Sequence, residues 1–241
     1  MDERIDDLEY KNLKIIQSPS CFCFGIDAVL LSDFSKEIKK NSVVADLCSG
    51  NGIISILLSA KCEAKKIYAV EIQDKIADMA IRSVKLNNLE NKIEVLNLDL
   101  KQLPKKFANG SFDSIVCNPP YMKENCGLVN ENNEKLIARH EIMCSIEDIA
   151  SVSFKLLKNN GTLYMVHRPD RLVDIISVLR KYKLEPKYLQ FVQPYRDKSP
   201  NLLLIKAVKN AKPFLKMCEP LIVYNNDGSY TNEILKIYNK I

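Results

Sequence analysis

The stretch from residue 43 to residue 117 alternates short apolar runs with helical patterns, and this alternation constrains the fold more than any other feature. Short runs rich in β-branched residues predict strands, and longer stretches with an apolar face predict helices. The expected strands are 43–47, 66–70, 93–97 and 112–117, with helices at 53–60 and 74–87. Parallel strands joined by helical crossovers form a sheet covered on both faces. The pattern therefore predicts a doubly wound α/β fold.

The rest of the chain adds further strands to this sheet, and the last two of them are not joined by a helix. The elements expected there are a helix capped by Ser145 that runs to Leu157 and ends at 159–161, a strand at 162–166, a helix at 170–182, and strands at 188–192 and 202–208. The last two strands have no helix between them, so they should pair antiparallel at the sheet edge. We therefore expect a mostly parallel, seven-stranded sheet with an antiparallel edge hairpin.

A chain of 241 residues suits a single domain with one large core. We expect residues 1–42 to form an N-terminal lid and helix, 43–208 the core, and 209–241 an arm with a short terminal helix. Asp27 is the expected N-cap of the first helix, which either packs on the sheet or helps to cover a site. The polar segment 122–140 is expected to be a loop, and a lid ordered by substrate is the alternative.

Composition excludes several classes of protein. Hydrophobic residues make up 46% and charged residues 27%, which indicates a globular chain. No apolar run approaches membrane-spanning length, and the acidic start lacks the features of a signal peptide, so we expect a cytoplasmic protein without membrane association. The net charge of +5 suits a polyanionic partner but does not by itself identify one.

Eight cysteines are scattered along the chain, and none forms a C-x-x-C pair. We interpret them as buried or incidental thiols rather than as a disulfide framework. With only two histidines present, we expect no metal site.

A glycine-containing turn lies between the first strand and its helix, in the segment Asp46-Leu47-Cys48-Ser49-Gly50-Asn51-Gly52. Glycines let the backbone approach a ligand closely, and the helix N-terminus offers free amides. A dinucleotide fingerprint requires Gly or Ala where this chain has Ser55. Asp46 would repel a pyrophosphate but suits an amino group, so the turn favours a nucleotide-like ligand that carries one.

Acidic residues also end the next two strands. Glu71 is placed to accept hydrogen bonds from ribose hydroxyls, and Asp99 is placed to meet an adenine amino group. One acidic strand end is weak evidence, whereas three in succession beside a glycine turn indicate a cofactor site.

The fourth strand runs into Asn118-Pro119-Pro120-Tyr121. Two prolines cannot continue a strand or a helix, so the strand stops there. Asn118 and Tyr121 then lie beyond the carboxyl edge of the sheet, where ligands bind in open α/β folds.

These motifs resemble those of the class I S-adenosylmethionine-dependent methyltransferases, which have a Rossmann-like fold. The resemblance implies S-adenosylmethionine as cofactor, bound by Phe24, Asp46, Cys48, Gly50, Gly52, Glu71, Asp99 and Asn118. Cys48 replaces the commoner first glycine, which fits if its dihedral angles are ordinary.

The Asn-Pro-Pro-Tyr step narrows the resemblance to enzymes that methylate a planar amide or an exocyclic amine. It implies Asn118, Pro119, Pro120 and Tyr121 as the catalytic residues. The Asn118 side-chain oxygen and the Pro119 carbonyl would accept hydrogen bonds from the two amino hydrogens, and Tyr121 would stack on the substrate.

Further segments resemble the bacterial tRNA (adenine-N6)-methyltransferases that act on the adenosine 3′ to the anticodon of a valine tRNA. They are Phe24 to Ala28, Ala138 to Glu141, His167 to Pro169 and Pro220 to Tyr224. The resemblance implies a tRNA partner, with Tyr121, Arg139, His140, His167 and Arg168 as substrate-binding residues. We expect no obligate protein partner.

Two other functions stay open. The first is glutamine-N5 methylation of a peptide release factor, by enzymes that use the same Asn-Pro-Pro-Tyr motif. That subgroup carries a sizeable helical domain before the cofactor strand, whereas only about forty residues precede Val43 here. A non-catalytic RNA-binding protein that kept the fold is the second alternative, although it has no reason to retain Asp46, Glu71, Asp99 and Asn118 together.

Overall fold

The computed structural model describes residues 2–19, 21, 23–120 and 144–241. Its central sheet has seven long strands and two short ones in these residues. The long strands are β3 (Val43–Leu47), β4 (Lys66–Glu71), β5 (Ile93–Asn97), β6 (Phe112–Cys117), β7 (Leu157–His167), β8 (Leu184–Gln193) and β9 (Leu202–Lys209). The short strands β10 (Lys216–Met217) and β11 (Leu221–Ile222) both pair with β8.

The order of the long strands is β5-β4-β3-β6-β7-β9-β8. All neighbours from β5 to β7 are parallel, whereas β9 pairs antiparallel with both β7 and β8. The mostly parallel sheet with an antiparallel edge hairpin is therefore confirmed. From β3 the chain builds outward through β4 and β5, and it then returns to place β6 on the other side of β3. This reversal makes β3 and β6 the switch point of the sheet, where ligands bind in open α/β folds.

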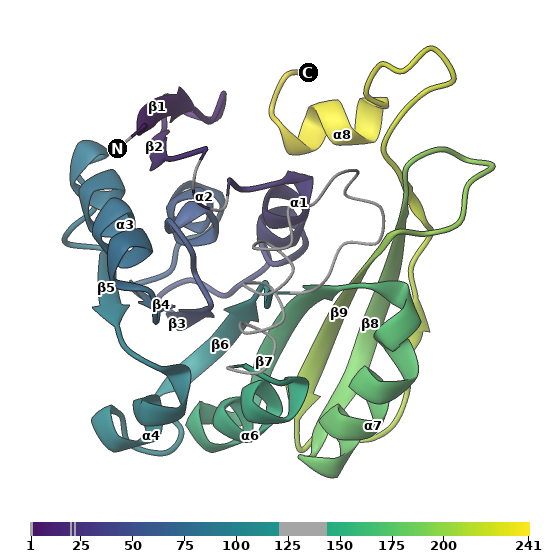
Figure 1. Cartoon of the computed structure of the whole chain (residues 1–241). Coiled ribbons are helices and arrows are strands. Elements are labelled where there is room, and N and C mark those ends of the chain that lie inside the picture. Colours follow the sequence, from purple (N-terminus) through teal and green to yellow (C-terminus); the bar gives the residue numbers. More distant parts are fainter. Residues whose placement is uncertain (1, 20, 22, 121–143) are drawn as a thin grey trace, which may run out of the picture.

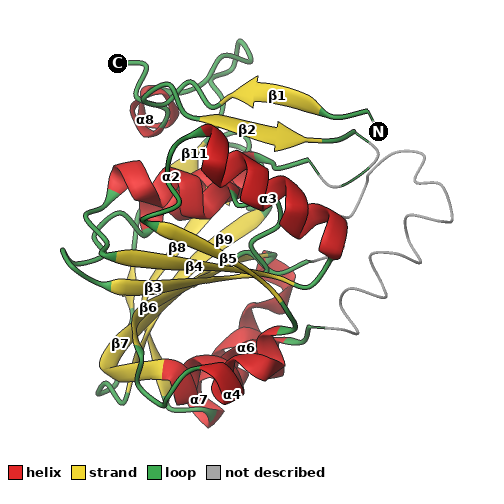
Figure 2. Ribbon diagram, turned by 90° about the vertical axis from the view of Figure 1, so that its left-hand side faces the viewer, coloured by secondary structure: helices red, strands yellow, loops and turns green. Residues whose placement is uncertain are grey.

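Helices cover both faces of the sheet (Figure 2). One face carries α1 (Ile26–Phe34), α2 (Ile53–Lys61) and α3 (Asp74–Leu86), and the other carries α4 (Leu103–Lys106), α6 (Ile146–Leu156) and α7 (Leu172–Lys181). Side chains of a strand alternate between the faces. Val116 accordingly packs in the cluster with α1 and α2, whereas Ile115 and Cys117 pack in the cluster with α6 and α7. The near-continuous apolar runs of the sequence arise because both faces are buried.

Two predicted helix boundaries are wrong. Asp27 does not cap α1, because the N-cap is Gly25 and Asp27 lies in the first turn. The helix capped by Ser145 does form, with a reciprocal hydrogen bond from Asp148, and it ends at Leu156, one residue before the predicted Leu157. Residues 159–161, which were expected to end it, lie inside β7 instead. Burial of Leu157, which pairs with Phe112, starts β7 early and overrides the local turn signal. A short 3₁₀ turn at Pro169–Arg171 also precedes α7.

The N-terminal segment forms a hairpin that was not predicted from the sequence. β1 (Arg4–Asp7) and β2 (Lys14–Gln17) pair antiparallel, apart from the main sheet. β2 is held on α3, where the Ile16 amide donates to the Ser83 hydroxyl at 2.9 Å. Figure 1 shows the hairpin above α2 and α3.

The C-terminal arm runs along β8 and ends in α8 (Asn232–Ile237), which Thr231 caps. In Figure 1, α8 lies on the same side of the sheet as the hairpin β1–β2. The division of the chain into lid, core and arm stays a prediction. No helix in the described ranges is long and apolar enough to cross a membrane.

Candidate active site

The carboxyl ends of β3, β4 and β6 bring several of the predicted site residues to one edge. Leu47 pairs with Val70 on one side and with Cys117 on the other, so the residues that follow these three strands lie level with one another. They are Cys48, Glu71 and Asn118. Asp99 follows β5, the next strand outward. The fold therefore gathers the polar strand ends around its switch point.

The turn after β3 has three residues in the left-handed region. Their φ angles are 57° at Cys48, 58° at Gly50 and 85° at Gly52. The condition of ordinary dihedrals at Cys48 is therefore not met, since this residue adopts a conformation that favours glycine. A Cβ at Gly50 would meet no atom within 4 Å in the described structure, whereas one at Gly52 would lie 3.4 Å from the Ala80 Cβ on α3.

The two glycines should therefore respond differently to substitution. Both Gly50→Ala and Gly52→Ala should destabilise the fold by about 1–2 kcal/mol, because each forces a Cβ into the left-handed region. Gly52→Ala should cost more, because its Cβ also crowds α3. Urea unfolding of both variants measures this difference. Equal losses would show that the approach of α2 to α3 is not tight.

Asp46 is fully buried at the end of β3. Its Oδ2 accepts hydrogen bonds from the Ser55 amide at 3.1 Å and the Ser55 hydroxyl at 2.8 Å, while Oδ1 has no hydrogen-bond partner among the described residues. Desolvation raises the pKa of this carboxyl from its ordinary value of 3.8 to about 7, and the nearby charge of Glu71 adds to the effect. A buried acceptor oxygen without a donor marks a place where a ligand's donor group would be stabilised.

The raised pKa predicts a pH dependence of stability. Between pH 4 and pH 7 the folded protein holds a proton on Asp46 that the unfolded chain has lost, so this group makes the free energy of unfolding fall as the pH rises. Asp46→Asn lacks this contribution. We expect the variant to gain stability over the wild type progressively from pH 5 to pH 7 and to hold that gain above pH 7, as measured by urea unfolding. A difference that stays constant across this range would contradict the assignment.

Glu71 and Asp99 both have local partners. Glu71 is buried, and its carboxylate accepts from the Gly50 amide at 3.0 Å and from the Gln73 amide at 2.9 Å. Asp99 accepts from the Lys101 amide at 2.9 Å, which caps a 3₁₀ turn at Leu100–Gln102. The bond from Gly50 to Glu71 ties the glycine turn of β3 to the end of β4. Carboxylate oxygens hold more than one lone pair, so these bonds leave further acceptor capacity.

The Asn118-Pro119-Pro120 step follows β6 directly. Pro119 is buried, and Asn118 and Pro120 are half-buried. The Asn118 side chain makes no hydrogen bond to any residue that the structure describes. Tyr121, Arg139 and His140 lie outside the described residues.

His167 and Arg168 follow β7 at the same edge. The His167 side chain is 3% exposed, and its Nδ1 accepts from the Arg168 amide at 2.8 Å. Burial lowers the pKa of His167 to about 4, and the charge of Arg171 adds to this effect. The imidazole is therefore neutral at pH 7, and its burial keeps it away from an RNA phosphate in this conformation. Arg168 is half-buried.

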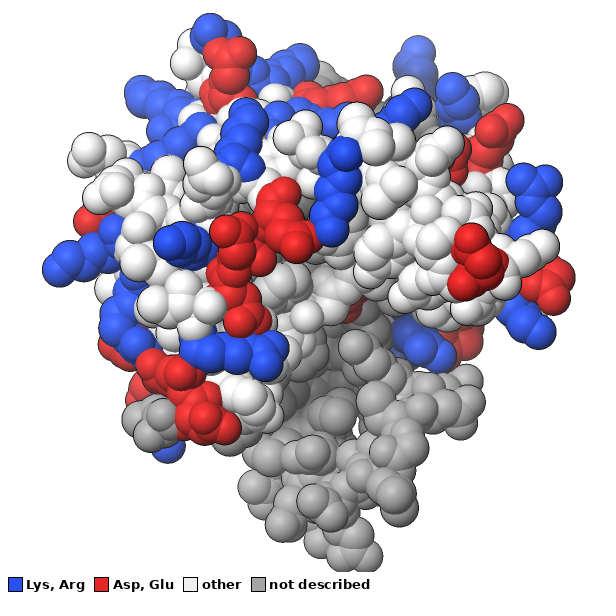
Figure 3. Space-filling view, turned by 90° about the horizontal axis from the view of Figure 1, so that it is seen from above, with Lys and Arg blue, Asp and Glu red and all other residues white. Residues whose placement is uncertain are grey.

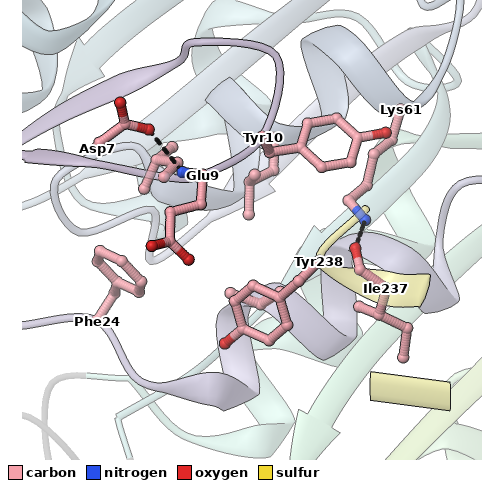
Figure 4. Close-up of a pocket in the computed structure, with 10 residues that line it drawn as sticks. Asp7, Glu9, Tyr10, Phe24, Lys61, Ile237 and Tyr238 are labelled. Carbon is pink, nitrogen blue, oxygen red and sulfur yellow. Dashed lines mark hydrogen bonds between the residues drawn. The ribbon is translucent and has the colours of Figure 1, made fainter. Parts of the chain in front are cut away.

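Phe24 lines a different part of the molecule from the strand ends. It borders a small pocket of about 90 Å³ together with Tyr10, Lys61 and Tyr238, between the β1–β2 turn, α2 and α8. Figure 4 shows the rings of Phe24, Tyr10 and Tyr238 around this space. The Lys61 ammonium is buried and donates to the Ile237 carbonyl at 2.9 Å and to Asp33 at 3.2 Å. Cofactor contact by Phe24 stays a prediction.

Sequence analysis missed two groups of residues at this edge. The first is Ser55, which the sequence analysis used only as evidence against a dinucleotide site. Its hydroxyl, in the first turn of α2, reaches the Asp46 carboxylate at the end of β3. The second group is Cys117 and Cys144, which meet the predicted cofactor residue Cys48 there, with 3.5 Å between the sulfurs of Cys48 and Cys144. Hydrogen bonding to Cys117 raises the pKa of Cys48, and hydrogen bonding to Cys48 raises that of Cys144. The three are neutral thiols that line one side of the site.

These features fit a small ligand that carries an amino group and hydroxyl groups. Among the described residues, the buried Oδ1 of Asp46 has no donor, nothing fills the space next to Gly50, and no side chain caps the N-terminus of α2. A pyrophosphate would meet the carboxylates of Asp46 and Glu71, so a dinucleotide fits poorly.

The fold and the site define a class I S-adenosylmethionine-dependent methyltransferase. The family model described as the methyltransferase small domain matches residues 12–181, and the chain belongs to this family. The tRNA1(Val) (adenine(37)-N6)-methyltransferase of Porphyromonas gingivalis is 25% identical over 242 residues, which cover 96% of this chain and 93% of that protein. The protein of the same name from Shewanella woodyi is 25% identical, with 88% of each chain covered.

Solved structures share the fold. A predicted O-methyltransferase, protein Atu636 from Agrobacterium tumefaciens, superposes with a TM-score of 0.71 at 21% identity, over 88% of this chain and 95% of that one.

Proposed function

We propose that this protein transfers a methyl group from S-adenosylmethionine to the exocyclic N6 of an adenosine in a tRNA anticodon loop, the adenosine 3′ of the anticodon of a valine tRNA. The observation that carries the proposal is the position of Asn118, which directly follows β6 next to the carboxyl end of β3, with that of β4 one strand further on. The printed names of the relatives from Porphyromonas gingivalis and Shewanella woodyi support this choice of substrate. Because tRNA is modified in the cytoplasm, we expect the protein to act there.

The cofactor would be held by the polar strand ends. Asp46 would accept from its amino group through the unused Oδ1, Glu71 from the ribose and Asp99 from the adenine, with Gly50 and Gly52 in the turn beside it. Phe24, Cys48 and Asn118 complete the set that the family resemblance implies. When bound, S-adenosylmethionine supplies an electrophilic methyl group on a sulfonium.

The acceptor nitrogen is a poor nucleophile, because its lone pair is conjugated with the adenine ring. The Asn118 side-chain oxygen and the Pro119 carbonyl would each accept a hydrogen bond from the amino group. These two bonds would fix the amino group and favour positive charge on the nitrogen as it attacks. Pro119 and Pro120 restrict the backbone, so these two oxygens are held in position with little freedom. No side-chain base is needed, because the nitrogen loses its proton as it becomes cationic or afterwards.

Contacts to the RNA complete the proposal. Tyr121 would stack on the adenine, and Arg139, His140 and Arg168 would contact the surrounding nucleotides. Unpaired loop bases are the usual targets of sequence-specific RNA recognition, because they can be turned out of the stack. For His167, burial favours support of the site wall over direct contact with a phosphate.

A transfer assay tests the function. Labelled S-adenosylmethionine is supplied separately with unmodified tRNA transcripts, a peptide release factor and DNA, and the labelled product is then identified. We expect N6-methyladenosine in the valine tRNA transcript alone. Label in the release factor but none in RNA would establish glutamine methylation instead. Cofactor binding without transfer to any of the three would favour the RNA-binding alternative.

A further inference from the structure

The hairpin between β8 and β9 lies at the same edge of the sheet as Asn118. β8 is antiparallel to β9, and β9 is antiparallel to β7, so β8 runs in the direction of β7 and β6. The residues that follow β8, starting at Pro194, therefore project from the carboxyl edge. Figure 1 shows this hairpin beside the arm that leads to α8.

Four tyrosines from the hairpin and the C-terminal arm stack in a row next to this edge. Ring centroids are 5.5 Å apart for Tyr195 and Tyr224, 5.4 Å for Tyr224 and Tyr230, and 5.7 Å for Tyr230 and Tyr238. The last two pairs are nearly parallel, at 14° and 15°. Backbone bonds brace the row, since the Tyr224 amide donates to the Pro194 carbonyl at 2.9 Å. Tyr195 is the end member of a rigid aromatic column.

Tyr195 also borders an open hollow. The hollow measures about 700 Å³ and is lined by Tyr195, Arg196, Asp197, Lys198 and Asn226. Tyr195 is half-buried, so one end of the column stays accessible to a flat ligand.

Two cations line the same hollow as Tyr195. Arg196 and Lys198 are both exposed, and Arg196 makes no ion pair within the described part of the chain. Lys198 lies 3.7 Å from Asp197, in a pair whose side chains are 62% and 76% exposed. Such a pair contributes little to stability, so the ammonium can exchange partners. Figure 3 shows basic and acidic side chains interspersed over the face seen from above, so this face carries no uniform positive charge.

An accessible aromatic ring flanked by cations is the arrangement with which proteins bind single-stranded nucleic acid, since bases stack on the ring and phosphates pair with the cations. We propose that the hollow beside Tyr195 binds one unpaired nucleotide of the RNA substrate, with its base against the Tyr195 ring and its phosphate at Arg196 and Lys198. This site is separate from the methyl-transfer site and rests on the proposed function. It gives the enzyme a second contact with the RNA loop that contains the target adenosine.

Affinity for an unmodified tRNA transcript tests the proposal, measured by fluorescence anisotropy at several salt concentrations. Tyr195→Ala should weaken binding roughly 5- to 150-fold, the range found for one stacked base. Tyr195→Phe keeps the ring and should bind like the wild type. Arg196→Ala with Lys198→Ala should lower the slope of log affinity against log salt by about 0.7, for one lost phosphate contact.

A matched control comes from the opposite end of the sheet. Lys105 and Lys106 are also an exposed basic pair, on α4, which leads back toward the start of β6. Lys105→Ala with Lys106→Ala should change neither the affinity nor the slope. S-adenosylmethionine affinity and melting temperature are measured for every variant, which separates loss of RNA contact from loss of the fold.

The outcomes distinguish this inference from the proposed function. If the wild type methylates tRNA but Tyr195→Ala and the Arg196 and Lys198 double variant bind it as tightly as the wild type, the hollow is not an RNA site. If Tyr195→Ala lowers only the melting temperature, the tyrosine column merely anchors the arm. If the wild type neither binds nor methylates RNA, the proposed function fails and this site fails with it.

Discussion

Asn118→Ala should lower the rate of methyl transfer by about 10²–10³-fold, the usual loss when one preorganised polar group is removed from a reacting centre. The Asn118 side chain has no hydrogen bond to the described residues, so its oxygen is available to the acceptor amine. Affinity for S-adenosylmethionine should change far less, because in the proposed site Asp46, Glu71 and the glycine turn would supply most of the cofactor contacts. Single-turnover transfer to saturating tRNA measures the rate.

Asn118→Asp is the matched variant. It keeps an acceptor oxygen of the same reach, so we expect it to retain more activity than Asn118→Ala. Melting temperatures of both should lie close to that of the wild type, because the side chain is half-buried and forms no described hydrogen bond. Equal rates for Asn118→Ala and the wild type would remove Asn118 from the mechanism.

Asp46→Asn should weaken S-adenosylmethionine binding by roughly 10- to 100-fold, which corresponds to one hydrogen bond that involves a charged group. The buried Oδ1 has no donor among the described residues, and the ligand amino group would supply one. The amide keeps the size of the side chain but removes its charge. Isothermal titration calorimetry measures the affinity.

Ser55→Ala separates the charge of Asp46 from its positioning. It removes the 2.8 Å bond from the Ser55 hydroxyl but leaves the carboxylate and the bond from the Ser55 amide in place. We expect a smaller loss of affinity than for Asp46→Asn. If Ser55→Ala is the more damaging of the two, orientation of the carboxylate rather than its charge governs binding.

The pH dependence of cofactor affinity would follow from the same carboxyl. In the free protein its pKa is about 7, so the affinity should rise as the pH increases toward that value. Both pH predictions follow from deprotonation of the same carboxyl. The deprotonated carboxylate makes the free protein less stable, and it is also the form that a cationic amino group would bind.

The sequence alone predicted the core of the sheet and the candidate site at its edge. Strand ends at Asp46, Glu71, Asp99 and Asn118 could be found because apolar periodicity and prolines are local signals. Helix boundaries failed where burial competed with a turn signal, as at Leu157. The N-terminal hairpin was missed because β2 is fixed by α3, whose Ser83 lies 67 residues away from Ile16.

What the sequence by itself determined was therefore the fold class and the chemical character of the strand ends. Only the tertiary structure decided which groups meet. It brought Ser55 to Asp46, Gly50 to Glu71, and Cys144 to Cys48 across 96 residues of sequence. It also stacked Tyr195 on tyrosines of the C-terminal arm. Such contacts depend on the order of strands in the sheet and on the path of the arm, which are set by packing over the whole chain and leave no local pattern to read.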